Sequence, residues 1–164
     1  MVLAGAVLGL VTLQRLGDLV LSRRNTERLL AQGAREAAPG HYPLIVALHA
    51  AWLVGLWYLA VWRADVGVSW GWLAVFVVLQ GLRLWVLATL GPRWTTRIIV
   101  LPGAPLVREG PYRFVSHPNY IIVAAEILVL PLCFGLVWYG LVFSMLNALV
   151  LWIRIRAEEA ALRQ

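Results

Sequence analysis

The chain has 164 residues, of which 62% are hydrophobic and only 13% are charged, and its mean hydropathy is +0.80. These values exclude an ordinary soluble domain, in which about a quarter of the residues are charged. They predict an all-α integral membrane protein. Because one helical crossing takes roughly 20 apolar residues, the chain holds about five transmembrane helices and no separate soluble domain. We therefore expect a single transmembrane domain over residues 1–164.

The net charge of +6 comes from fourteen arginines, no lysine and eight acidic residues. The arginines lie in short loops between apolar segments, so they indicate contact with membrane lipids and argue against a nucleic-acid partner. Cys133 is the one cysteine and is interpreted as a small buried hydrophobe, which leaves no disulfide or cysteine-based metal site within the chain. The first apolar segment lacks the pattern of a cleaved signal peptide and is expected to remain in the protein.

Five apolar segments can be recognised, at residues 2–21, 44–62, 70–90, 120–134 and 136–153. The last two are short and meet at Gly135, which predicts a tight helical hairpin that crosses the bilayer only partly or where it is thin. A polar loop is expected at residues 22–43, and functional residues should concentrate in the mixed stretch 91–118. Most tryptophans lie near segment ends and are interpreted as interfacial anchors, namely Trp52, Trp57, Trp62, Trp70, Trp72, Trp94, Trp138 and Trp152.

The distribution of arginines predicts the orientation in a membrane. If five segments alternate, eleven arginines fall on one side and only Arg63 falls on the other. The eleven are Arg23, Arg24, Arg28, Arg35, Arg93, Arg97, Arg108, Arg113, Arg154, Arg156 and Arg163. We therefore expect the N-terminus outside the cell, and the C-terminus and both long loops on the cytoplasmic face.

Four charged residues lie inside apolar segments, where each costs about 2.5–3.5 kcal/mol near the centre of a bilayer. Arg15 and Asp18 are three positions apart on one helical face and are expected to neutralise each other. Arg83 either extends to the cytoplasmic interface or lines a polar pocket that opens toward it. Glu126 is either the partner of Arg83 in a buried ion pair or a carboxylate that lines a ligand pocket, and these two roles are compatible.

The second half of the chain contains four motifs, which are Leu106-Val107, Gly110-Pro111-Tyr112-Arg113, His117-Pro118-Asn119-Tyr120 and Arg154-Ile155-Arg156-Ala157-Glu158-Glu159-Ala160-Ala161-Leu162. In this order and spacing they resemble the isoprenylcysteine carboxyl methyltransferase (ICMT) family, over about residues 75–164. The resemblance implies an S-adenosylmethionine-dependent methyltransferase. It also implies N-terminal helices and a cytoplasmic loop at residues 1–74, followed by a cofactor-binding catalytic core at residues 75–164.

The resemblance assigns roles to individual residues. The cofactor is expected to contact Val107, Gly110, Pro111, Tyr112, His117, Asn119, Tyr120, and one of Glu158 and Glu159. Arg154 is expected to be catalytic by this resemblance, and Glu126 and Arg83 are added as catalytic candidates because they are charged residues inside apolar segments. Arg154 would help to hold the site or the methyl acceptor.

The start of the fourth segment suits an anionic group. Pro118 fits the first turn of a helix that Ser116 can cap, and the free amides there can bind the carboxylate of a methionine moiety. His117 either contacts the cofactor or serves as a helix cap. His41, His49 and His117 lie on separate segments, so no metal site is expected.

The turn and the chain end also have physical interpretations. Gly110 lets the backbone approach a ligand, Pro111 fixes the turn, and Tyr112 can cover an adenine ring. The alternative for this Gly-Pro-Tyr-Arg segment is an ordinary turn at the membrane interface.

Arg154 and Glu158 are four positions apart and could form a solvated pair. However, acidic residues at a helix C-terminus oppose the macrodipole, so a cationic partner such as the cofactor's amino group is expected.

Methyl transfer from a sulfonium is an in-line displacement, so the protein has to align two ligands and exclude water, without a covalent residue. Arg83 or Arg154 could hold an anionic acceptor, which needs no base. Glu126 could assist a neutral phenol. The cofactor is expected to enter from the cytoplasm and the acceptor sideways from the lipid.

The first half of the chain bears on the acceptor through Glu27-Arg28, Gly33-Ala34-Arg35-Glu36, His41-Tyr42-Pro43 and Arg93-Trp94-Thr95-Thr96-Arg97. These stretches resemble a bacterial branch of the family that accompanies type III polyketide synthases and methylates alkylpyrones or alkylresorcinols on oxygen. The lysine-free, arginine-rich composition also indicates a bacterial protein. We expect a long-chain phenolic or enolic lipid as acceptor. A prenylcysteine, a non-catalytic lipid-binding scaffold and a transporter are the alternatives.

Overall fold

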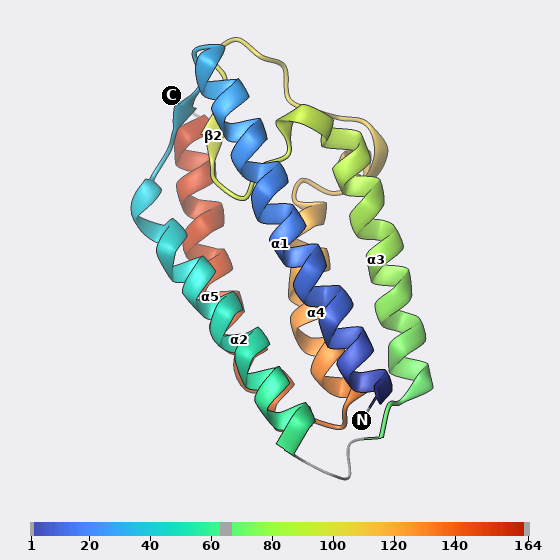
Figure 1. Cartoon of the computed structure of the whole chain (residues 1–164). Helices are drawn as coiled ribbons and strands as arrows, with labels where there is room; N and C mark the ends of the chain where they lie inside the picture. The colour runs from blue at the N-terminus through green and yellow to red at the C-terminus, as the bar shows by residue number, and fades with distance from the viewer. Residues whose placement is uncertain (1, 63–66, 163–164) are drawn as a thin grey trace.

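The computed structural model of the chain describes residues 2–62 and 67–162. Five α-helices form a bundle, namely α1 Val2–Ala31, α2 Tyr42–Trp62, α3 Trp70–Leu90, α4 Pro118–Cys133 and α5 Val137–Leu162 (Figure 1). In this part of the chain, 4 helices, α1, α2, α3 and α5, are long and apolar enough to cross a membrane, and α4 is a shorter apolar helix. The prediction of an all-α integral membrane protein is confirmed.

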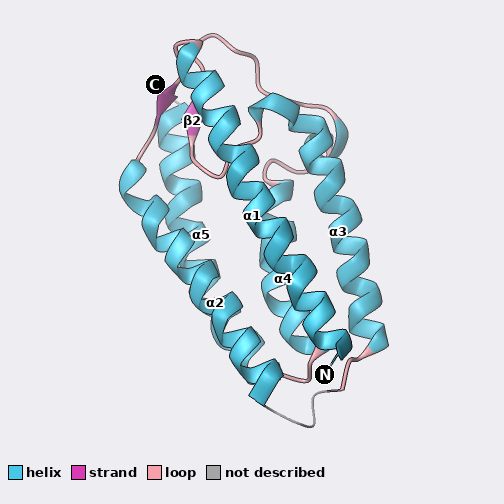
Figure 2. Cartoon of the chain, in the orientation of Figure 1, coloured by secondary structure: helices cyan, strands magenta, loops and turns pink. Residues whose placement is uncertain are grey.

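Short elements and long loops gather at the end of the bundle where α1 and α5 end (Figure 2). An antiparallel pair of strands joins β1 Arg35–Glu36 to β2 Ile99–Val100. Three 3-10 turns are η1 Pro39–His41, η2 Gly91–Arg93 and η3 Gly110–Arg113. The arginines of residues 23–35, 93–113 and 154–156 lie on these elements, on the loops or on the adjoining helix ends, so this end is termed the arginine-rich end.

Two helices run beyond their apolar segments. A polar loop was predicted at residues 22–43, but helix α1 continues to Ala31, so the prediction is wrong for residues 22–31. Both helices of the hairpin were predicted to be short. This is confirmed for α4, which has 16 residues, and wrong for α5, which has 26. Both extensions are rich in Arg, Leu, Glu and Ala, which favour the helix once it leaves the apolar region.

The turn between α4 and α5 is centred on Gly135, as predicted. Gly135 has φ +70, a backbone conformation that only glycine adopts freely. Its N–H donates to the Leu132 carbonyl at 3.1 Å, and the Leu136 N–H donates to the Pro131 carbonyl at 3.0 Å. The two helices are therefore antiparallel, which places the start of α4 near the end of α5.

The core is apolar and lies between the helices, with fully buried members that include Leu8, Leu56, Ile127 and Leu130. Cys133 is also fully buried, which confirms its interpretation as a small hydrophobe. Trp52 and Trp94 are 1% and 2% exposed, so the interpretation as interfacial anchors is wrong for these two. Trp52 is buried because it packs in the main apolar core, and Trp94 is buried because it packs beside Val86 in a second, smaller cluster.

Hydrogen bonds hold the loop after α3 against the extension of α1. Ser22 Oγ lies 2.7 Å from Thr96 Oγ1 and accepts a hydrogen bond from the Thr96 N–H at 2.8 Å. Asn25 Nδ2 donates to the carbonyls of Gly91 and Trp94, at 3.2 and 2.8 Å. The extension of α1 is thus the platform that positions this loop at the arginine-rich end.

Candidate active site

Four side chains meet where α4 begins and α5 ends. The Tyr120 hydroxyl donates to Glu158 Oε2 at 2.6 Å and accepts a hydrogen bond from Arg154 Nε at 2.8 Å. His117 Nδ1 lies 3.8 Å from the same Glu158 oxygen, and the His117 and Tyr120 rings stack with centroids 5.3 Å apart. The fold therefore brings together four residues from two motifs that lie more than 30 positions apart, and we term them the α4–α5 cluster.

The start of α4 differs in detail from the prediction. His117, not Ser116, is the N-cap residue, and no side chain caps the helix, so the predicted Ser116 cap is wrong. The Ser116 side chain is exposed, whereas the His117 ring stacks on Tyr120. Pro118 occupies the first turn, as predicted. Pro118 has no N–H and the Tyr120 N–H donates to the His117 carbonyl, so Asn119 supplies the backbone N–H of this helix start that is left for an anionic ligand group.

The end of α5 separates the two adjacent glutamates. Glu158 is partly buried and belongs to the α4–α5 cluster, whereas Glu159 lies about 100° further around the helix and is exposed. Arg154 is 6% exposed and donates to Tyr120, so it is not one half of a solvated pair with Glu158. The cluster therefore places a buried guanidinium and a carboxylate on either side of one phenol hydroxyl.

The Gly-Pro-Tyr-Arg turn forms η3 against the end of α3. Gly110 has φ +53, and a Cβ at this position would collide with the Thr89 hydroxyl, so both backbone and space require glycine. Pro111 is buried, and Tyr112 is partly buried. Burial, followed by the negative charge of Glu158, raises the pKa of Tyr112 to about 12. The Tyr112 phenol, which is neutral at physiological pH even at its ordinary pKa, therefore stays neutral to still higher pH.

Two further residues of the predicted cofactor set lie beside these elements. Asn119 is in the first turn of α4, and its Oδ1 is buried with no hydrogen-bond partner among the described residues. Val107 is in the loop before η3 and is partly buried. An unpartnered acceptor oxygen beside His117 and Tyr120 is available to a ligand donor such as an amino or hydroxyl group.

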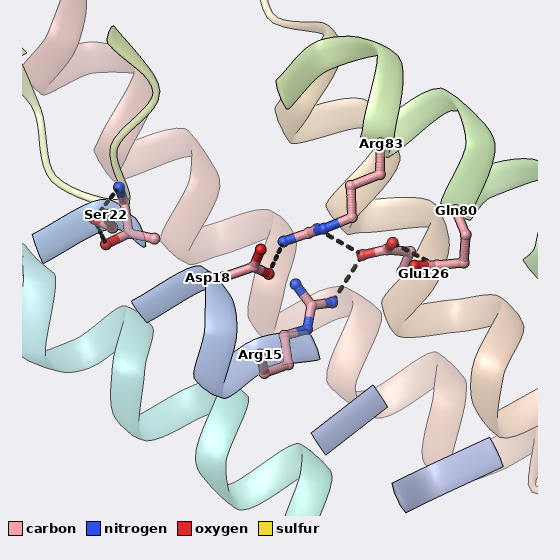
Figure 3. Close-up of polar contacts among 7 residues, drawn as sticks. Arg15, Asp18, Ser22, Gln80, Arg83 and Glu126 are labelled. Atoms are coloured by element: carbon pink, nitrogen blue, oxygen red, sulfur yellow. Dashed lines mark hydrogen bonds and ion pairs between the residues drawn. The ribbon is translucent and has the colours of Figure 1, made fainter. Parts of the chain in front are cut away.

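A second polar cluster lies between α1, α3 and α4 (Figure 3). Glu126 Oε2 accepts hydrogen bonds from Arg15 at 2.7 Å and Arg83 at 3.1 Å, and Glu126 Oε1 accepts one from Gln80 Nε2 at 2.8 Å. Arg83 also forms an ion pair with Asp18. We term these five residues the membrane ion cluster. Its two cations and two anions balance, which offsets part of the cost of burying charge in a bilayer.

The membrane ion cluster decides between the alternatives for its residues. The predicted Arg83–Glu126 ion pair is confirmed, and Arg83, 3% exposed, does not extend to the interface. The expectation that Arg15 and Asp18 neutralise each other is wrong, because Arg15 pairs with Glu126 of α4 and Asp18 with Arg83 of α3. Within the described part of the chain, no hydrogen bond or ion pair joins this cluster to the α4–α5 cluster. The catalytic roles expected of Arg83 and Glu126 stay predictions.

Two amide side chains inside apolar helices, one half-buried and one buried, were absent from the predicted set. Gln80 is the third partner of Glu126, and Asn147 of α5 is 1% exposed. The sequence alone could have indicated both residues, because each is a lone amide inside an apolar segment, where a polar group needs a partner. Gln80 also lies three positions before Arg83, on the same face of its helix.

The fold and these sites define an integral membrane protein whose last two helices carry a polar cluster at the arginine-rich end. The family model of the isoprenylcysteine carboxyl methyltransferase (ICMT) family matches residues 72–164, which include the whole α4–α5 cluster, η3 and Gln80, Arg83 and Glu126 of the membrane ion cluster. The chain belongs to this family. Membership makes it a membrane methyltransferase, of a family that generally uses S-adenosylmethionine.

Similarity to two bacterial proteins extends over nearly the whole chain. The Bacillus subtilis protein "Uncharacterized protein YpbQ" is 37% identical over 161 residues, which cover 96% of this chain and 95% of that protein. An uncharacterized protein of Haemophilus influenzae is 26% identical over 155 residues, covering 90% and 88% of the two chains. No solved structure matches the chain. Both similarities extend beyond the family region into the N-terminal half of the chain.

Proposed function

We propose that the protein transfers a methyl group from S-adenosylmethionine to an oxygen of a lipophilic acceptor, a long-chain alkylresorcinol or alkylpyrone. The observation that carries the proposal is the α4–α5 cluster, in which a buried cation, a carboxylate and two stacked rings meet beside an uncapped helix start. These groups fit the cofactor, since it presents a cationic amine, a carboxylate, ribose hydroxyls and an adenine ring.

Each group of the cofactor has a matching residue in the chain. Glu158 and the unpartnered Asn119 Oδ1 would accept hydrogen bonds from the amine or the ribose hydroxyls. The free Asn119 N–H at the start of α4 would receive the carboxylate. His117, with Tyr112 from η3, would provide ring surfaces for the adenine. Glu159 is assigned no contact, because it is exposed.

The chain's contribution to the transfer is alignment and exclusion of water. When bound, the cofactor supplies a methyl group on a sulfonium sulfur, which becomes a neutral thioether as the acceptor oxygen takes the methyl carbon. The acceptor hydroxyl would lose its proton to solvent before the transfer, readily for an acidic enol and at a higher cost for a phenol with a pKa near 10, and the buried Arg154 would hold the resulting anion. All contacts of the Glu126 carboxylate are with donors, which favours a role in holding α1, α3 and α4 together over a role as base.

The distribution of arginines supports a proposed orientation in the membrane. The arginine-rich end supports an orientation with the α4–α5 cluster on the cytoplasmic face of a bacterial membrane and the N-terminus outside. S-adenosylmethionine would then reach the cluster from the cytoplasm, and the acceptor would arrive through the lipid. A type III polyketide synthase is the class of enzyme that would supply an alkylresorcinol or alkylpyrone.

The first test is calorimetric titration of S-adenosylhomocysteine into the purified, detergent-solubilised protein. We expect micromolar binding by the wild type, a loss of about 10-fold or more in Glu158→Gln, and no change in the matched control Glu159→Gln. Equal effects of the two substitutions would refute the assignment of Glu158. A folded wild type that binds no S-adenosylhomocysteine would refute the proposed activity.

The acceptor is tested separately, by transfer of a radiolabelled methyl group to extractable lipid. Alkylresorcinol, alkylpyrone and S-farnesylcysteine are compared at equal concentration in mixed micelles. Labelling of the first two supports the proposal, whereas preferential labelling of S-farnesylcysteine would identify a prenylcysteine carboxyl methyltransferase instead.

A further inference from the structure

Asn147 is a buried amide without a partner in the middle of α5. Its side chain is 1% exposed, and neither Nδ2 nor Oδ1 has a hydrogen-bond partner among the described residues. Ser144, one turn earlier on the same helix, also has a buried hydroxyl without a partner in that part of the chain. Asn147 therefore presents unused donors and an unused acceptor inside the bundle.

Other charged and polar side chains in the membrane region contrast with this amide. Glu126, Arg83 and Arg15 are buried or half-buried, and each has a partner on a different helix, although Arg15 Nε and Arg83 Nε have none among the described residues. Asn147 differs because neither of its polar side-chain atoms is bonded there. A buried amide that forms no hydrogen bond costs stability, and the hydrocarbon of a bilayer has no water to supply one. An unpaired amide at this depth is expected where a ligand provides the missing bonds.

The position of Asn147 relates it to the candidate active site. Asn147, Arg154 and Glu158 are spaced by seven and four residues, so they lie on one face of α5. Arg154 is two turns further along, roughly 10 Å by helical rise. Long helical side chains lean toward the helix N-terminus, so the Arg154 guanidinium is inclined toward the Asn147 level. A ligand held by Arg154 would therefore have Asn147 on the same helical face, toward the N-terminus of α5.

We propose that Asn147 is an acceptor-binding residue that hydrogen-bonds the second oxygen of the acceptor ring, the one that is not methylated. This inference rests on the proposed function. A carboxamide is neutral and both donates and accepts hydrogen bonds, so it suits a hydroxyl or a carbonyl oxygen on an uncharged lipid head. It does not favour an acceptor with a second charged group. The acceptor class selected in this way is a two-oxygen ring, such as a resorcinol or a pyrone, in preference to a simple phenol.

The test compares two acceptors that differ by one hydroxyl, a 5-alkylresorcinol and the 3-alkylphenol with the same chain. For the wild type we expect kcat/KM to favour the resorcinol by about 10-fold or more, because a site built to bond a hydroxyl discriminates against its absence. In Asn147→Leu the ratio should fall to about one, through a lower kcat/KM for the resorcinol, while affinity for S-adenosylhomocysteine is unchanged. Met145→Leu, at an exposed position on the same helix, is the matched control and should keep the preference.

A second readout does not depend on turnover. Because Asn147→Leu removes an unpaired buried amide, the ligand-free variant should have a Tm equal to or above that of the wild type, whereas a purely structural amide would lower it. If the Asn147→Leu variant does not fold because leucine is too large for the site, Asn147→Ala gives the same comparison of acceptors.

The outcomes separate the two proposals. A wild type that methylates both acceptors but keeps its preference in the Asn147 variants overturns this inference alone. A lowered Tm of Asn147→Leu together with an unchanged acceptor preference also overturns this inference alone. A wild type that binds no cofactor and methylates neither acceptor overturns the proposed function, and this inference with it.

Discussion

The indole N–H of Trp52 in α2 donates a hydrogen bond to the backbone carbonyl of Ile127 in α4, at 3.2 Å. In a regular helix this carbonyl would accept from the residue four positions later, but that residue is Pro131, which has no N–H. The proline therefore frees a carbonyl in the membrane interior, and a tryptophan from another helix satisfies it. This bond explains why Trp52 is buried, although tryptophans of membrane proteins are common at interfaces.

We expect Trp52→Phe to destabilise the protein by about 1–3 kcal/mol, because it leaves the Ile127 carbonyl buried and unpaired. The measurement is thermal unfolding in detergent. In a Pro131→Ala background the restored N–H can bond Ile127, so the cost of Trp52→Phe should become smaller. An identical cost in both backgrounds would show that the proline and the tryptophan are not coupled.

The membrane ion cluster supplies a second prediction. Glu126→Gln removes the carboxylate that pairs with both Arg15 and Arg83, and should destabilise the protein by about 3–5 kcal/mol. Breaking the exposed Arg23–Glu27 pair with Arg23→Gln is the control and should cost at most about 1 kcal/mol. Equal melting temperatures for the two variants would contradict the structural role of the cluster.

Tyr120→Phe tests the hydroxyl at the centre of the α4–α5 cluster. The ring can still stack on His117, but Arg154 and Glu158 lose the group they share, so the affinity for S-adenosylhomocysteine should fall by about 5- to 10-fold. Tyr139→Phe is a matched control, because its hydroxyl bonds the Trp52 carbonyl far from this cluster. The control should lower the melting temperature and leave cofactor affinity unchanged. If both variants bind the cofactor equally well, the Tyr120 hydroxyl has no part in binding.

Gly110→Ala should distort η3, since it combines an unfavourable positive φ with a collision against Thr89. We expect a loss of about 1–3 kcal/mol in stability and weaker cofactor binding. Gly81→Ala, in α3 with open space around it, is the control and should be neutral or slightly stabilising. The double variant Thr89→Ala/Gly110→Ala should recover only part of the loss, because the backbone strain persists. Full recovery would mean that the collision alone requires glycine.

Hydropathy and motif spacing were enough to predict the helical membrane class, the turn at Gly135 and the family, because these depend on local composition and on residues close in sequence. They also predicted the Arg83–Glu126 pair, since two opposite charges in neighbouring apolar segments have few other partners. Local patterns failed where a helix leaves the membrane, as at the extension of α1 to Ala31. There, helix propensity and contacts with the loop at Thr96 replace hydropathy as the deciding factors.

The partners of individual side chains depended on how each helix is rotated about its axis, which no single segment encodes. Glu158 faces Tyr120 while its neighbour Glu159 is exposed, although the two are chemically identical. Arg15 and Asp18 share one face of α1, yet each pairs across the bundle, because α3 and α4 bring opposite charges closer than the local spacing does. Helix packing, which maximises buried apolar area and satisfies buried polar groups together, selected these pairs from several that the sequence alone allows.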